Sequence, residues 1–146
     1  MSKPRYDEGH WPIVLVTMPK EELDDAELSQ HLDRMSSFSK RGVPFVHIVD
    51  LRMTASLSAE ARRLIAERSD RDEEAYPGVL VGLAVVLATP LQRGIFKAIN
   101  WLSQASRPSE AFSDLETATA WARRLLAAPA RSAAMPVAAD VAKRVG

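Results

Sequence analysis

The chain contains no cysteine, which excludes disulfides, thiolate metal sites and a cysteine nucleophile. Acidic and basic residues number nineteen each, so no net charge attracts the protein to nucleic acid or to an anionic membrane. No apolar run approaches the roughly 20 residues of a membrane span, and the amino terminus lacks the apolar segment of an export signal. We therefore expect a cytoplasmic protein with no transmembrane segment and no nucleic-acid partner.

Short apolar segments alternate with helical patterns along the 146 residues, a length that fits one domain. The strand-like segments are 12–18, 43–51, 79–88 and a short one at 110–112. Residues 5–10, "RYDEGH", are a candidate edge strand that turns back through Gly9. The segment 43–51 is apolar on both faces, as in a central strand covered by helices on each side, and a helical pattern extends over 58–74.

Capping motifs mark the starts of the other helices. Asp24 with Glu27, and Thr89 with Gln92, form capping-box pairs, and "SDLE" at 113–116 is a third. The helix after Thr89 carries an apolar stripe that we expect to be buried, formed by Leu91, Ile95, Ala98, Ile99 and Leu102.

This order of elements predicts an α/β fold: a four- to five-stranded mixed, mostly parallel sheet with about four helices packed on it. We expect a single domain over residues 1–128 and an alanine- and proline-rich tail over 129–146. Loops at the carboxyl ends of parallel strands converge at one edge of the sheet, where ligands and partners are usually met. The candidate binding edge therefore comprises Asp50, Arg52, Thr54, Ser56, Ser58, Thr89, Gln92 and Arg93.

Asp50 ends the second long strand, and the phrase "FSDLETATAWARRLL" occupies residues 112–126. With the order of elements, these features resemble the STAS-like, SpoIIAA-like group of small bacterial domains. That group is related in fold to anti-sigma-factor antagonists and, more distantly, to CRAL-TRIO lipid-binding domains. The resemblance covers about residues 5–127. It implies a STAS-like sheet and a non-enzymatic role in protein contacts or signalling.

One departure from the antagonists concerns their phosphorylated serine, which directly follows the aspartate. Here Asp50 is followed by "LRMTASLSAEARR", and the nearest serines are Ser56 and Ser58. The phosphoswitch therefore does not transfer simply. A phosphate on Ser58 would still be favoured by the helix start and by the arginines at 62 and 63, so Ser58 is kept as a candidate phosphosite.

The sequence shows no recognisable catalytic motif, and we expect no enzyme, no metal and no cofactor. Asp50 could serve as a general base or metal ligand, but pairing with Arg52 or Arg93 is the favoured interpretation. The three histidines lack the short spacings of zinc sites. Because His47 alternates with Phe45 and Val49 on one strand face, we expect a hydrogen-bonded histidine in or near the core.

Phe96, Lys97 and Trp101 lie at the margins of the apolar stripe on the third helix and form a candidate interface. The leading hypothesis is a regulatory or scaffolding domain that binds a partner protein, with self-association in a homodimer as one form. The alternative is a small-molecule or lipid-binding domain with an apolar pocket between its helices and sheet. An enzyme that uses Asp50 at the strand ends ranks third.

Overall fold

The computed structural model describes residues 3–54, 57–102 and 107–128, with residues 99–102 described as backbone only. The predicted tail over 129–146 lies outside these residues. The strands are β1 (Arg5–His10), β2 (Ile13–Thr17), β3 (Phe45–Asp50), β4 (Leu80–Val86) and β5 (Ser109–Phe112). The helices are α1 (Asp25–Ser39), α2 (Ala59–Ala75), α3 (Pro90–Leu102) and α4 (Leu115–Ala127).

The five strands form one mixed, mostly parallel sheet in the order β1-β2-β3-β4-β5, which confirms the predicted fold class. β1 is antiparallel to β2, and every other neighbouring pair is parallel. The turn between the first two strands lies at Trp11–Pro12 rather than at Gly9, because β1 continues to His10 and the Trp11 N–H donates to the Glu8 carbonyl oxygen. β3 takes the central place that its double-sided apolar pattern predicted.

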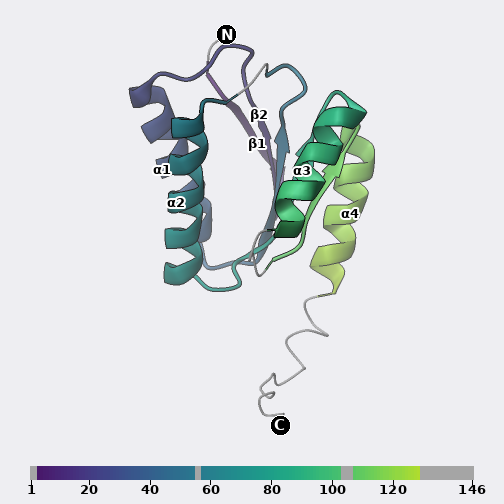
Figure 1. The fold of residues 1–146 in the computed structure, drawn as a ribbon. Helices are drawn as coiled ribbons and strands as arrows, with labels where there is room; N and C mark the ends of the chain where they lie inside the picture. Colours follow the sequence, from purple (N-terminus) through teal and green to yellow (C-terminus); the bar gives the residue numbers. More distant parts are fainter. Residues whose placement is uncertain (1–2, 55–56, 103–106, 129–146) are drawn as a thin grey trace.

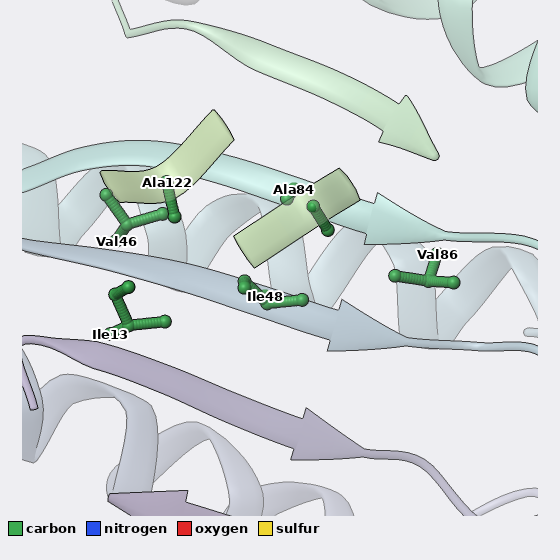
Figure 2. Close-up of a cluster of buried hydrophobic side chains, with 7 residues drawn as sticks. Ile13, Val46, Ile48, Ala84, Val86 and Ala122 are labelled. Carbon is green, nitrogen blue, oxygen red and sulfur yellow. The ribbon is translucent and has the colours of Figure 1, made fainter. Parts of the chain in front are cut away.

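Helices cover both faces of the sheet (Figure 1), with α1 and α2 on one side and α4 on the other. On the α4 side, alternate residues of β2, β3 and β4 pack against two alanines of the helix. Figure 2 shows this cluster, with Ala122 of α4 over the strand residues. The cluster comprises Ile13, Val46, Ile48, Ala84, Val86, Ala118 and Ala122. Small alanine side chains bring the helix close to the strands, so this layer is tightly filled.

The helix starts follow the predicted capping motifs with one correction. Asp24 accepts the Glu27 N–H at 2.8 Å while the Glu27 side chain accepts the Asp24 N–H at 3.0 Å, so the capping box of α1 is confirmed. At α4 the cap is Asp114, whose Oδ1 accepts the Thr117 N–H at 2.8 Å, and not Ser113. The Asp114 carboxylate therefore satisfies a free N–H group of the first turn, and the helix begins one residue later than the predicted capping box implies.

The expected burial of the α3 stripe is wrong for the residues whose side chains are described. Leu91 is 73% exposed and Ile95 is 51% exposed, and Ala98 is exposed as well. α3 lies against β5, a strand of only four residues at the sheet edge, and its contact face lies on the side of Arg93 and Phe96. The sheet ends before it can cover the apolar stripe, which therefore points outward. The side chains of Ile99, Trp101 and Leu102 lie outside the described residues.

α2 covers the sheet poorly. It packs mainly on α1, where Ala61 meets Leu28 and Leu32, and Ala61 is the only residue of α2 that is buried. Ten of its seventeen residues are charged, and Leu64 and Ile65 are its only large aliphatic side chains. A helix of this composition cannot fill the space above a sheet, and a cavity remains beneath it.

Candidate functional site

The carboxylate of Asp50, at the carboxyl end of β3, is fully engaged with Arg52. Its Oδ1 accepts the backbone N–H of Arg52 at 3.0 Å and the Nε–H at 2.9 Å, and its Oδ2 accepts Nη2–H at 2.8 Å. Burial is the largest influence on the Asp50 pKa and raises it, but the hydrogen bonds and charge of Arg52 outweigh burial, so the pKa lies below its usual value. Of the two predicted partners, Arg52 is therefore the one that pairs with Asp50. Arg93 instead donates to the Leu87 carbonyl oxygen at 2.8 Å.

The other described polar residues of the candidate edge also serve the local fold. The Thr54 hydroxyl donates to the Pro19 carbonyl oxygen at 3.0 Å. Thr89 and Gln92 complete the predicted capping box of α3 with two hydrogen bonds of 3.1 Å. Parallel pairing of β3 with β4 does bring the two loops to one edge of the sheet, but Thr89 and Gln92 bond to each other and Thr54 bonds to the segment after β2. Ser56 lies outside the described residues.

Ser58 is the N-cap of α2. Its Oγ accepts the Ala61 N–H at 3.0 Å, and its own N–H donates to the Glu22 carboxylate at 3.2 Å. The Arg62 guanidinium donates to the Leu57 carbonyl oxygen at 2.7 Å. A phosphate on Ser58 would meet the favourable helix start and the repelling carboxylate of Glu22 together. Phosphorylation of Ser58 stays a prediction.

A cavity of about 220 Å³ lies between the sheet and the helices α1 and α2. Its floor is the sheet face that carries Phe45, Val49, Leu83 and Val85, and its walls come from α1 and from the face of α2 around Ile65. Most of the lining is aliphatic or aromatic. The cavity is therefore suited to a small apolar molecule or to the apolar part of a larger one.

Three polar atoms in the cavity lining are buried without a hydrogen-bond partner among the described residues. They are Nε2 of His47, Nε of Arg107 and Oε1 of Glu73. Arg107 Nη2 donates to the Ser69 hydroxyl at 2.6 Å, and Arg107 Nη1 lies 3.8 Å from Glu73 Oε1. Buried polar groups nearly always have partners, and each one without a partner costs about 1–3 kcal/mol. Arg107 and Glu73 lie together, and the Arg107 charge is near enough to His47 to lower the pKa of that histidine, so we call these three residues the polar region of the cavity. The lining also carries the charged residues Arg68 and Asp72.

Two histidines lie in the lining, and both are held neutral. Burial is the main cause that lowers the pKa of His47 to about 3, and the nearby His31 and Arg107 lower it further. Burial lowers the pKa of His31 to about 4. His31 Nδ1 forms a 2.6 Å hydrogen bond with the Tyr6 hydroxyl. His47 is buried as predicted, but the expected hydrogen bond is absent at Nε2 within the described part of the chain.

Sequence reasoning pointed to the sheet edge and missed the polar region of the cavity. His47 was recognised as an inward-facing residue, but Arg107 and Glu73 lie far from it in the chain and carry no motif. The available signal was compositional, because a helix as charged as 59–75 cannot cover a sheet face densely. Within the described ranges, no group of three or more His, Asp or Glu could hold a metal ion, and no helix is long and apolar enough to cross a membrane.

No family model and no curated protein match the chain by sequence. Among solved structures, it is similar to an uncharacterised protein of the DUF3478 family with a SpoIIAA-like fold from Shewanella loihica. That match has a TM-score of 0.60 and 16% identity, and it covers 82% of this chain and 91% of the other. The chain has a SpoIIAA-like fold. The anti-sigma factor antagonist SpoIIAA in its unphosphorylated form is also similar, with a TM-score of 0.57 and 17% identity over 82% of this chain and 96% of that one. These values confirm the predicted STAS-like, SpoIIAA-like resemblance at the level of the fold.

Proposed function

We propose that this SpoIIAA-like chain is a non-catalytic binding domain whose ligand is a small, largely apolar molecule held beneath α2. The cavity between the sheet and the helices α1 and α2 carries the proposal. Its lining combines a broad apolar surface with a few buried polar atoms, which is the usual composition of small-molecule sites. The proposal of a non-catalytic role is supported by Asp50, whose carboxylate is already occupied by Arg52.

Dispersion explains why a ligand would be held there. The residues that line an empty cavity lose contacts with neighbouring atoms, and those contacts are restored when a molecule of matching size enters. α2 gains most from such a molecule, because Ala61 is its only buried residue and Leu64 and Ile65 are only partly buried. A ligand would therefore contact both α2 and the sheet, and its binding would raise the stability of the folded state.

The test uses the purified full chain and heptan-1-ol, an uncharged probe with an apolar chain. A ligand that binds only the folded state raises the unfolding midpoint, by several degrees at concentrations far above its dissociation constant. Ile65→Phe places a larger side chain at the cavity wall, and Ala66→Phe adds the same side chain at the exposed neighbouring position of α2.

We expect the probe to raise the midpoint of the wild type and of Ala66→Phe, and to leave Ile65→Phe nearly unchanged. Titration by protein-observed NMR should place the shifted amides on β3, β4 and α2. If the probe moves none of the three midpoints, or moves all three equally, the cavity is not its binding site and the proposal fails.

A second candidate function is contact with a partner protein, and the exposed apolar side chains at the strand ends favour it. Met53 follows β3 and is 65% exposed, while Leu91 and Ile95 lie in the first turns of α3 after the neighbouring strand β4. Large apolar side chains exposed on neighbouring segments often mark protein-binding surfaces. The similarity in fold to an anti-sigma factor antagonist is consistent with such a partner.

Self-association is the form of this second candidate that can be measured directly. Sedimentation equilibrium of the wild type and of a Leu91→Ser, Ile95→Ser double variant would reveal a dimer that depends on α3. We expect the variant to be monomeric where the wild type self-associates. A wild type that stays monomeric at high concentration removes the homodimer, and cross-linking to a candidate partner then tests the remaining form. The predicted interface residues Phe96 and Lys97 contribute to the α3 face that meets β5.

A further inference from the structure

The polar region of the cavity defines which head group a ligand can carry. This inference rests on the ligand-binding function proposed above and asks which chemical class the site accepts. The relevant atoms are Arg107 Nε, a donor; Glu73 Oε1, an acceptor; and His47 Nε2, which donates or accepts according to the tautomer. A ligand that satisfies all three must offer both an acceptor and a donor.

The cavity lining contains two arginines and two acidic residues, so its formal charges sum to zero. Arg107 lies beside Glu73, with 3.8 Å between Nη1 and Oε1. Of the two other charged residues of the lining, Arg68 pairs with Asp33 at 3.0 Å, and Asp72 accepts a hydrogen bond from Ser36 at 2.9 Å. A carboxylate ligand would add a negative charge next to Glu73, and an ammonium ligand would add a positive charge next to Arg107. Either charge would also lose its hydration on entry, and that loss is costly for an ion without a counter-charge.

We propose that the cavity binds a neutral amphiphile, in which a short apolar body is joined to an uncharged head that both donates and accepts hydrogen bonds. A primary amide is the simplest such head. Both Arg107 Nε and Glu73 Oε1 are fully buried, so these side chains must turn toward the cavity for the amide carbonyl oxygen to accept from Arg107 Nε–H and for the amide N–H to donate to Glu73 Oε1. The apolar body then lies on the sheet floor formed by Phe45, Leu83 and Val85. His47 Nε2 can donate a hydrogen bond to the amide head group or accept one from it, according to its tautomer.

Size limits the body of the ligand. An engineered apolar cavity of about 150 Å³ holds benzene, which has six carbon atoms. Scaled in proportion, a cavity of about 220 Å³ holds roughly nine non-hydrogen atoms. Heptanamide and heptanoate each contain that number of atoms and differ only in the head, so they form a matched pair of probes.

The experiment compares the two probes by isothermal titration calorimetry on the full chain at pH 7. We expect heptanamide to bind at least tenfold more tightly than heptanoate. Glu73→Gln removes the negative charge that balances Arg107. In the wild type, Glu73 Oε2 accepts the Gly78 N–H at 3.0 Å, and the amide oxygen of the new side chain can keep this hydrogen bond. In this variant Arg107 is unbalanced, so heptanoate should gain at least tenfold in affinity. Heptanamide should bind more weakly, because a donor NH2 group takes the place of the acceptor Glu73 Oε1.

Glu74→Gln is the matched control, because it makes the same chemical change at the exposed next residue of α2. It should leave both affinities as in the wild type. Equal or tighter binding of heptanoate by the wild type would overturn the neutral-head inference while leaving a ligand site in the cavity. An unchanged preference in Glu73→Gln would overturn it as well. If heptanamide, heptanoate and heptan-1-ol all fail to bind, the proposed ligand-binding function itself fails.

Discussion

Affinity should rise with ligand chain length and then stop rising, because the cavity beneath α2 has a fixed size. Each buried methylene contributes about 0.8 kcal/mol, which corresponds to roughly a fourfold gain in affinity. Butanamide and hexanamide differ by two methylenes and both fit a space for roughly nine non-hydrogen atoms. Hexanamide should therefore bind about fifteenfold more tightly than butanamide.

The gain should end between hexanamide and octanamide, where the cavity of about 220 Å³ becomes full. From octanamide to decanamide the expected change is less than about twofold, since the added methylenes remain in water and bury no further surface. Calorimetric titration of the four amides against the full chain measures the series. A gain that continues unchanged through decanamide would indicate adsorption to an open surface, and it would refute a binding site of this limited size.

Three further predictions concern the fold around the site. Asp50→Asn should lower the free energy of unfolding by about 1.5 kcal/mol at pH 7 through the loss of charged hydrogen bonds from Arg52. Because the Asp50 pKa is lowered in the folded state, this difference should shrink as pH falls below about 3.8 in denaturant titrations; a constant difference would contradict it. The pKa values of His31 and His47 are also lowered, to about 4 and about 3, so the unfolded state binds more protons between pH 6.5 and about 4. The wild type should approach a loss of about 1.4 kcal/mol per histidine per pH unit in that window. His47→Leu should roughly halve that slope between pH 6 and pH 5, and an unchanged slope would refute the buried neutral state of His47. Ser58→Ala should cost about 1 kcal/mol through loss of the α2 cap, whereas Ser58→Asn, which keeps a capping oxygen without adding charge beside Glu22, should cost little; an unchanged stability of Ser58→Ala would show that the cap contributes nothing.

Local chemistry made much of the fold predictable from the sequence. Asp24 with Glu27 fixed the start of α1, and β-branched runs bounded by proline and glycine fixed the long strands. The parallel order followed from the alternation of strands and helices, and the shared edge of the loops after β3 and β4 followed from that order. Asp50 could likewise be assigned to an ion pair, because its partner Arg52 lies two residues away.

What could not be predicted depends on how far each strand extends and on contacts between distant segments. The stripe of α3 has a strong helical period, but only the short length of β5 decides that Leu91 faces solvent. Arg107 meets Glu73 across 34 positions of sequence and through the packing of a loop against α2. Neither residue belongs to a motif, so no spacing rule could have brought them together.

The two faces of the sheet indicate where a ligand should be expected. On the α4 face, Ala118 and Ala122 allow close approach of the helix, and the strand residues beneath are fully covered. On the opposite face, the large buried side chains Phe38 and Phe45 fill one end of the layer between the helices and the sheet. The charged helix α2 contributes few apolar side chains to the other end. A protein interior normally packs as densely as an organic crystal. Because of this asymmetry, the space over one half of this sheet face is not filled by side chains. The unfilled volume lies beside Arg107 and Glu73. Their polar atoms have no hydrogen-bond partner in the described part of the chain, and a second molecule that rests on the apolar floor can supply one.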